Sequence, residues 1–307
     1  MEAPMPHDAV IIGGSYAGLS AAMQLVRARR RVLVIDDGRP RNRFSARAHG
    51  MLAMDGRPGS EISADARAQV AAYPTAAFRI GEATAAVAVD GGFEITLDDG
   101  GKTSGRRLLL AHGVVDELPD LPGVRERWGR TALHCPYCHG YEIGGGSIGV
   151  LGAGPMSVHQ ALMVADWGDV TLFLNGVVTP DAEEALKLAR RGVNVEPTPV
   201  VALEGEAPTL TGARLADGRR VPLKAIFVGP RLRQPGRMAE ALGCEMEETL
   251  AGTIVRTDEW KQTTVPGVFA AGDTARAMSN LTLASADGVM AGVALHRSLI
   301  AEQIGGF

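Results

Sequence analysis

The apolar positions at the start of the chain predict a strand, a helix and a second strand in close succession. Residues 9–12 form an apolar run of strand length, and residues 32–35 form another. Between them, apolar residues recur at the spacing of one helix face, at Leu19, Ala22, Met23 and Val26. We therefore predict a β-α-β unit at the N-terminal end of the chain.

The same pattern recurs in the middle of the chain. A strand is predicted from Ile148, a glycine-rich turn covers residues 152–157, and a further strand is predicted over residues 170–174. Helical spacing connects the apolar residues between turn and strand, which are Val158, Ala161, Leu162 and Ala165. Two β-α-β openings in one chain predict an α/β fold with two Rossmann-like dinucleotide-binding domains.

A glycine-rich turn precedes each predicted helix. In the first turn, Gly13, Ser15 and Gly18 occupy the place where a dinucleotide fold brings the pyrophosphate to a helix N-terminus. Asp36 ends the following strand, 23 residues after Gly13, close to the usual offset of an acid that binds a ribose hydroxyl. Neither turn is a perfect G-x-G-x-x-G, but two turns with matching strands and helices support each other.

Two stretches rich in proline and glycine divide the rest of the chain. Residues 118–123 and 229–236 are predicted linkers. We therefore expect a first dinucleotide-type domain over residues 1–116 and 236–307, interrupted by a smaller domain over residues 117–235.

Composition excludes several classes of function. A chain of 307 residues with 46% hydrophobic and 21% charged residues suits a globular enzyme with two cores of ordinary size. A net charge of −4 provides no basic surface for nucleic acid, and no apolar run reaches the roughly 18 residues of a membrane span. The first seven residues lack the charged and apolar regions of a secretory signal. We expect a cytoplasmic enzyme that binds neither nucleic acid nor membrane.

Two of the three cysteines, Cys135 and Cys138, form a Cys-x-x-Cys pair just upstream of the second glycine-rich turn. Such a pair can close a small redox-active disulfide. Zinc binding is the alternative, but a structural zinc takes four ligands, and His134 and His139 flank the pair too closely to complete a tetrahedron easily. Cys244 stands alone and is expected to be a buried apolar residue. We therefore predict a redox-active disulfide and no metal site.

Residues 264–273 resemble the second FAD motif of flavoproteins with two dinucleotide-binding domains. Together with the first turn, residues 111–113 and the Cys-Pro-Tyr-Cys sequence, they make the whole chain resemble the low-molecular-weight thioredoxin reductases. This resemblance implies a homodimer with FAD, in which Asp273 binds the ribityl chain and a helix near residues 283–288 points its N-terminus at the flavin. The other residues expected in the FAD site are Gly13, Ser15, Gly18, Asp36, Asn42, His49, Ala111, Gly113, Gly272 and Ala284. For Asn42, a solvated basic loop over residues 39–43 is an equal alternative, and for His49 packing is the favoured alternative.

Two departures from that family bear on function. The family carries a His-Arg-Arg run and a further arginine that bind the 2′-phosphate of NADPH, whereas residues 174–180 contain no cation. The nearest cations, at positions 187, 190 and 191, lie in a downstream helix, and NADPH is not expected to bind well. In addition, His139 stands where the family has Asp after the second cysteine. Both departures resemble the FAD-dependent dithiol oxidases that close disulfides in small natural products of the gliotoxin, holomycin and romidepsin types.

The resemblance implies that a small-molecule dithiol is oxidised to an intramolecular disulfide, with O2 reoxidising the flavin to give H2O2. A substrate thiolate would attack Cys135, and Cys138 would face the flavin. His139 is the candidate base that removes the thiol proton, and His134 is the second candidate; packing or helix capping is the alternative for His139. The runner-up function is a thioredoxin reductase-like disulfide reductase driven by NADH or a reduced carrier protein, and a flavin-bound redox sensor is the third.

Overall fold

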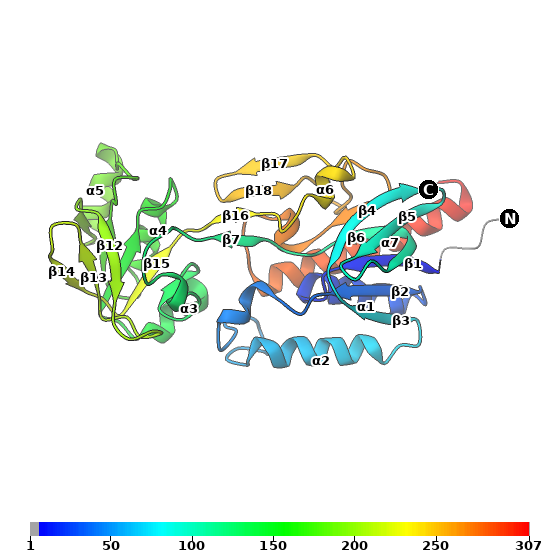
Figure 1. Ribbon diagram of the computed structural model, residues 1–307, viewed down its shortest axis with the longest axis horizontal. Coiled ribbons are helices and arrows are strands. Elements are labelled where there is room, and N and C mark those ends of the chain that lie inside the picture. The colour runs from blue at the N-terminus through cyan, green and yellow to red at the C-terminus, as the bar shows by residue number, and fades with distance from the viewer. Residues whose placement is uncertain (1–5, 307) are drawn as a thin grey trace. The chain divides into compact units, whose positions relative to one another are not determined.

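The computed structural model describes residues 6–306 and divides the chain into two compact units, each of which is described by itself below. Unit 1 contains the chain up to Arg41, Ser60–Val115 and the chain from Arg233 onward. Unit 2 contains Asn42–Gly59 and Asp116–Leu232. Both units are built on parallel sheets with helices, as the two β-α-β patterns predict (Figure 1).

The elements of unit 1 are β1 (His7–Ile12), α1 (Tyr16–Arg27), β2 (Val32–Asp36), α2 (Gly59–Ala71), β3 (Ala76–Ile80), β4 (Ala83–Val89), β5 (Gly92–Leu97), β6 (Lys102–Leu110), α6 (Met238–Ala241), β17 (Met246–Thr249), β18 (Gly252–Val255), β19 (Val268–Ala270), η3 (Gly272–Ala275) and α7 (Leu281–Ile304). The main sheet has the strand order β3-β2-β1-β6-β5-β4, with β19 paired to β6. The strands β1, β2, β3, β6 and β19 pair in parallel, so their carboxyl ends lie at one edge.

The core of unit 1 follows from the alternation of side chains along these strands. Ile11, Val34 and Leu109 are buried together with α1 and α7 in one apolar cluster. Their neighbours Ile12 and Leu110 are buried in a second cluster, together with β5 and α6. Because both faces of the central strands are covered, these strands appear in the sequence as continuous apolar runs.

The elements of unit 2 are η1 (Arg41–Phe44), η2 (Arg125–Arg127), β8 (Ala132–Leu133), α3 (Pro136–Ile143), β9 (Ser147–Leu151), α4 (Ser157–Val164), β10 (Asp169–Phe173), α5 (Ala182–Arg190), β11 (Asn194–Glu196), β12 (Val200–Glu204), β13 (Gly212–Leu215), β14 (Arg220–Pro222) and β15 (Ala225–Val228). Its parallel sheet has the order β11-β10-β9-β15-β8, and β12-β13-β14 form a separate antiparallel sheet. One face of the parallel sheet packs against this smaller sheet, and the other packs against α4 and α5.

The chain passes between the units at β7 (Val115–Glu117) and β16 (Arg231–Arg233), close to the two predicted linkers. Apart from shifts of one to three residues at the linkers, the units differ from the expected domains in one segment: Asn42–Gly59 groups with unit 2, whereas the sequence boundaries place it in the first domain. The physical reason lies in the contacts of this segment, because Phe44 lies directly against Gly129 and His49 pairs with Glu142.

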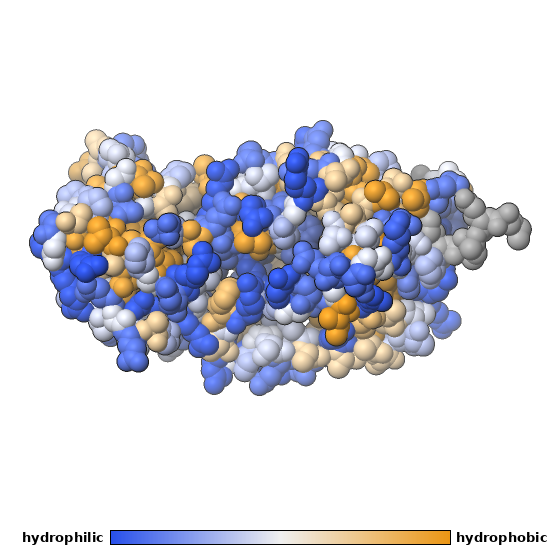
Figure 2. Space-filling model, viewed as in Figure 1, coloured by the Kyte–Doolittle hydropathy of each residue, from blue (hydrophilic) through white to orange (hydrophobic). Residues whose placement is uncertain are grey.

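Figure 2 shows hydrophilic and hydrophobic residues mixed over the visible surface of each unit. Within residues 6–306, no helix is long and apolar enough to cross a membrane.

Candidate active site and cofactor-binding residues

The redox pair lies at the start of α3. Cys135 and Cys138 form a disulfide, and Cys135 is the N-cap residue of the helix. The Cys135 sulfur accepts the backbone N–H of Cys138 at 3.2 Å, and Pro136 occupies the first helical position, where its missing N–H costs nothing. A helix N-terminus stabilises negative charge, so this position favours a thiolate on Cys135 once the disulfide is opened.

The two faces of α3 differ in burial. Gly140 is buried, and a Cβ at this position would lie within 2.9 Å of the Trp167 ring, so only glycine allows this close packing. Tyr137 meets the edge of the Trp167 ring with the centroids 5.5 Å apart, yet Tyr137 and Tyr141 stay exposed. Trp167 therefore packs against α3 at Gly140 and Tyr137, while the two tyrosines keep most of their surface exposed.

His139 is half-buried on α3, beside two groups with which it interacts electrostatically. Burial lowers the pKa of His139; Glu142, one helical turn further along, opposes this effect, and His49 adds to it. The net result is a pKa below the ordinary value, so His139 is neutral and able to accept a proton at neutral pH.

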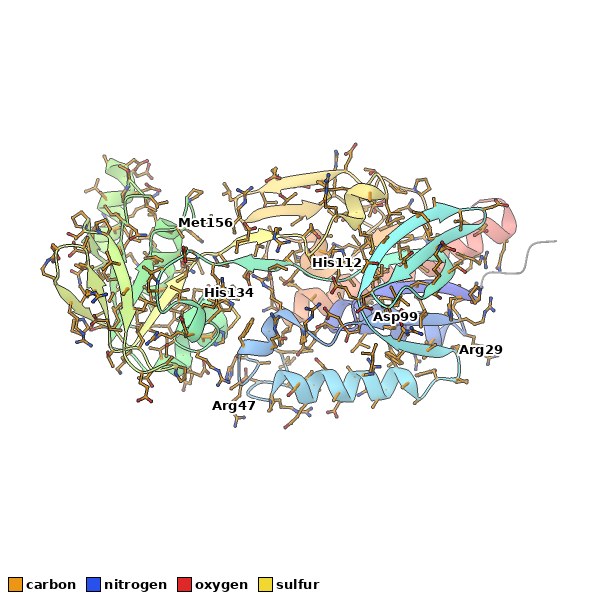
Figure 3. All side chains as sticks on the ribbon, in the orientation of Figure 1. Arg29, Arg47, Asp99, His112, His134 and Met156 are labelled. Atoms are coloured by element: carbon orange, nitrogen blue, oxygen red, sulfur yellow. A yellow bond between two sulfur atoms is a disulfide. The ribbon has the colours of Figure 1, made fainter. Side chains whose placement is uncertain are left out.

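His134 has a different environment. Its ring stacks on Trp128 with the centroids 5.8 Å apart, and its carbonyl oxygen accepts a hydrogen bond from the side chain of Gln160 at 2.8 Å. Figure 3 labels His134 in the segment that leads into α3. The stacking holds the ring against unit 2 and gives His134 a packing role that the sequence pattern did not reveal.

In unit 1, the first glycine-rich turn is closely packed between strand ends. Gly13 has a φ of +103°, and a side chain there would collide with the backbone of Ala111. Gly18 likewise packs on the carbonyl of Gly13. Ser15 is the N-cap residue of α1, but its side chain makes no capping hydrogen bond, which leaves this helix end without a side-chain acceptor of its own. Asp36 accepts the N–H of Gly14 at 3.1 Å, so β2 and the turn are joined through this carboxylate.

The carboxyl ends of β6 and β19 bring a second set of predicted residues together. The N–H of Gly113 donates to the hydroxyl of Thr274, at 2.8 Å, and Thr274 is completely buried. A Cβ on Gly272 would lie 2.9 Å from Ala17 and 3.7 Å from Ala284. These contacts place Gly113, Gly272 and Ala284 near the N-terminal end of α1. Thr274 was missed by the sequence analysis, although it directly follows Asp273 in the motif.

His112 lies in the same region of unit 1, where Figure 3 labels it. Its burial lowers its pKa, and the neutral ring can donate from Nδ1 to the carbonyl oxygen of Gly113 at 3.1 Å. This contact favours a packing role for His112.

Asp273 is already engaged by a cation. Arg41 Nη1 lies 2.8 Å from its carboxylate and 2.5 Å from the Ser279 hydroxyl, although 232 residues separate Arg41 from Asp273 in the sequence. The helix predicted near residues 283–288 begins at Leu281, and the Asn280 side chain accepts the N–H groups of Thr282 and Leu283. Arg41 therefore joins the segment after β2 to the FAD-type motif.

A buried ion cluster anchors α7. Asp287 is 1% exposed and accepts two hydrogen bonds from Arg276, at 2.9 and 2.8 Å, and pairs with Lys261 at 2.9 Å. Burial alone would raise the pKa of Asp287, but the bonds from Arg276 and Lys261 outweigh burial and keep the pKa below its ordinary value. This carboxylate, which no sequence pattern singled out, links α7 to Arg276, just after η3, and to Lys261.

The predicted site residues thus fall into two groups. Gly13, Gly18, Asp36, Ala111, Gly113, Gly272, Asp273 and Ala284 lie in unit 1, around the carboxyl ends of its parallel strands. Cys135, Cys138, His134 and His139 lie in unit 2, and so do Asn42 and His49, which we had expected beside the cofactor. Glu142 was missed, and its position three residues after His139 on one helix was the available signal.

Comparison with known proteins identifies this arrangement. The profile of the pyridine nucleotide-disulphide oxidoreductases matches residues 7–288. The chain belongs to this family. A relative named thioredoxin reductase tcpT, from Claviceps purpurea, is 33% identical over 312 residues, which cover 96% of this chain and 95% of that protein. The protein named thioredoxin reductase sirT, from Leptosphaeria maculans, is 31% identical over 307 residues, which cover 94% and 93%.

Two solved structures are similar over nearly the whole chain. An oxidoreductase from Agrobacterium tumefaciens is 49% identical with a TM-score of 0.92, covering 96% of this chain and 99% of that one. The structure of HlmI is 38% identical with a TM-score of 0.91, covering 97% and 94%. These similarities confirm the predicted resemblance and fold, and they make the chain an oxidoreductase of the disulfide type.

Membership in the pyridine nucleotide-disulphide oxidoreductases implies FAD. The residues of unit 1 fit this cofactor on two observations: the Gly13 turn has no room for a side chain, and the end of α1 lacks a side-chain cap. Both suit a pyrophosphate at a helix N-terminus. Asp36, at the end of β2, has the carboxylate that suits an adenosine ribose.

Proposed function

We propose that this chain is an FAD-dependent dithiol oxidase that forms an intramolecular disulfide in a small-molecule dithiol, with O2 as the final electron acceptor. The observation that carries the proposal is the second glycine-rich turn, which provides the pyridine nucleotide site in a reductase. Here the hydroxyl of Ser157 accepts the N–H groups of Ala153 and Gly154, at 3.0 and 3.3 Å. The turn therefore satisfies with its own side chain the amides that would bind a pyrophosphate.

The burial of Ser157 strengthens this argument. Ser157 is 3% exposed and is the first residue of α4, directly after Met156, which Figure 3 labels. The N-cap residues of α1 and α4, Ser15 and Met156, both lack a side-chain capping bond, so the difference between the turns lies in the amides before the helix. The two turns look alike in sequence but differ in how their amides are satisfied: the Ser157 hydroxyl accepts two amides of the second turn, whereas in the first turn Asp36 accepts one, that of Gly14.

Arg219, whose partner Glu196 is paired with Phe173 at the end of β10, and two of the cations at positions 187, 190 and 191 are engaged in ion pairs. Arg219 makes two hydrogen bonds to Glu196, at 2.8 and 3.1 Å, and holds the pKa of that carboxyl at about 2. Lys187 pairs with Glu183 at 2.6 Å, and Arg191 pairs with Asp166 at 2.8 Å. These pairings support weak binding of the 2′-phosphate of NADPH, which needs charge-assisted contacts.

The chemistry assigned to unit 2 is a two-step thiol–disulfide exchange. A substrate thiolate attacks the sulfur of Cys135, the bond from Cys135 to Cys138 breaks, and Cys138 leaves as a thiolate. The second substrate thiolate then attacks the substrate sulfur of the mixed disulfide, which closes the product disulfide and releases Cys135. The cysteine pair has gained two electrons, and two thiol protons have left the substrate. His139, neutral at physiological pH, accepts one of them.

FAD supplies the remaining chemistry when it is bound, because it takes the electron pair from the cysteines and passes it to O2, giving H2O2. We propose that Gly13, Ser15, Gly18 and Asp36 hold its pyrophosphate and adenosine ribose. Asp273, oriented by Arg41, would bind its ribityl chain.

The second candidate function is a disulfide reductase driven by NADH or a reduced carrier protein. The relatives named thioredoxin reductase favour it, because such an enzyme runs the same exchange in the opposite direction. The two functions differ in what reduces the flavin.

Anaerobic mixing of the purified flavoprotein with one reductant at a time separates them. A small dithiol such as dithiothreitol should bleach the flavin of the native protein, and the Cys135→Ser variant should stay oxidised. NADPH and NADH should leave the flavin absorbance largely unchanged. Rapid stoichiometric bleaching by either nucleotide would favour the reductase instead.

A further inference from the structure

A second histidine faces the redox helix from a distant part of the chain. His49 Nδ1 lies 3.4 Å from a carboxylate oxygen of Glu142 and 3.5 Å from one of Asp55. The His49 side chain is 17% exposed. Glu142 stands one helical turn after His139, so both side chains lie on neighbouring positions of the same helix face. His139, Glu142 and His49 therefore form a cluster, which we call the histidine cluster.

The segment that carries His49 is fixed by its own hydrogen bonds. The N–H of Ala48 donates to the backbone carbonyl oxygen of Arg57 at 2.8 Å, and the N–H of Gly56 donates to that of Ala48 at 2.9 Å. Asp55, which faces His49, also accepts the N–H of Gly50 at 2.8 Å. These hydrogen bonds close the loop on itself and hold His49 in a defined position.

The proposed oxidation creates a need for such a cluster. Oxidation of a dithiol to a disulfide releases two electrons and two protons, and a flavin reduced to its anionic form keeps only one of the protons. The other proton must leave through the protein while the thiolate forms. The histidine cluster offers groups that can exchange protons near neutral pH.

We propose that His49 and Glu142 are positioning residues that act through His139, so that the proton acceptor of the reaction is the histidine cluster and not a single imidazole. This inference rests on the proposed function. Glu142 holds and orients the imidazolium that forms on His139, and His49 limits how strongly that carboxylate favours the charged form.

The electrostatics give the two positioning residues opposite effects. The titratable groups that face His139 are Glu142 from its own helix and His49 from the 42–59 segment. Glu142 raises the pKa of His139 and His49 lowers it, while Asp55 faces His49 from within the loop. Loss of His49 should therefore raise the pKa of His139, and loss of the Glu142 charge should lower it.

The test compares His49→Gln, Glu142→Gln and the control His159→Gln, whose histidine is exposed on α4. The first readout is an NMR titration of the histidine ring protons in the oxidised holoprotein, with His139 assigned from a His139→Gln variant. The midpoint for His139 should move up in His49→Gln, down in Glu142→Gln and not at all in His159→Gln. Midpoints that move together, or do not move, would overturn the proposal.

The second readout is the pH dependence of flavin reduction by a small dithiol. Below the midpoint, where neutral His139 limits the rate, His49→Gln should be slower than native protein and Glu142→Gln faster, each by about two- to tenfold. At high pH, where His139 is neutral in both, the rates of flavin reduction of the native protein and His49→Gln should become equal. If the NMR midpoint of His139 shifts but the pH profile of flavin reduction does not, the histidine cluster takes no part in proton transfer and the proposal is overturned. If no dithiol reduces the native flavin, the proposed function fails, while the titration still decides whether the cluster exists.

Discussion

Replacement of Asp36 by alanine tests the assignment of unit 1 to the adenosine half of FAD. Asp36 ends β2, and its carboxylate accepts the N–H of Gly14 at 3.1 Å. The Asp36→Ala variant removes that acceptor and the carboxylate proposed to bind a ribose hydroxyl. Any loss of FAD affinity in this variant should therefore come from one local change at the end of β2.

The expected magnitude follows from the bonds that are lost. A hydrogen bond to a charged group is worth about 1.5–3 kcal/mol, which corresponds to FAD binding about 10- to 150-fold weaker for one ribose contact. The lost bond to Gly14 should in addition destabilise the turn by about 1 kcal/mol. Asp36→Asn keeps an oxygen that can accept this N–H, so its loss of FAD affinity should be smaller.

The assay is titration of apoprotein with FAD, followed by quenching of flavin fluorescence. Asp37→Ala is the matched control, because the neighbouring carboxylate is used by Arg39, whose N and Nε donate to it at 2.9 and 2.8 Å. Asp37→Ala should bind FAD as the native protein does. If both variants bind FAD with equal affinity, the assignment of Asp36 to the ribose is refuted.

Three further outcomes are expected. Cys135→Ser and Cys138→Ser should each abolish dithiol turnover, measured as loss of free thiol; turnover in either variant would mean that substrate reaches the flavin without the disulfide. Ser157→Ala frees the N–H groups of Ala153 and Gly154, so calorimetry should show tighter NADH binding, by about tenfold or less; unchanged binding would show that the hydroxyl does not close the turn. Asp287→Asn should lower stability in urea at pH 7 by about 3 kcal/mol, because it leaves Arg276 and Lys261 without a buried counter-charge. Since the pKa of Asp287 is lowered in the folded state, this difference should be present above pH ~4 and shrink as the pH falls further; a constant difference would rule out the charge as its cause.

The parts of the fold that depend on local pattern were predictable from the sequence. The apolar stripe from Leu19 to Val26 lies within α1, and the run at residues 9–12 lies within β1. Two glycine-rich turns, each with a strand before it and a helix after it, were sufficient to predict two dinucleotide-type folds. The apolar periods of strands and helices can be recognised within a short stretch of sequence.

The parts of the site that depend on long-range pairing were not predictable in the same way. Arg41 meets Asp273 across 232 residues, and His49 meets Glu142 across the boundary between two segments of unit 2. No spacing rule connects such pairs, because they form only when strands and loops are packed. The bond from the second turn to Ser157 could have been predicted more easily, since serine near the start of a helix commonly bonds to backbone amides.

Oxygen consumption during dithiol oxidation tests the central claim most directly. The native flavoprotein is mixed aerobically with a small dithiol and no nucleotide, and O2 uptake, H2O2 and product disulfide are measured together. A dithiol oxidase should consume one O2 and form one H2O2 for each disulfide, and Cys135→Ser should do neither. Absence of O2 uptake, combined with NADH-dependent reduction of a disulfide by the same preparation, would contradict the oxidase and establish the reductase.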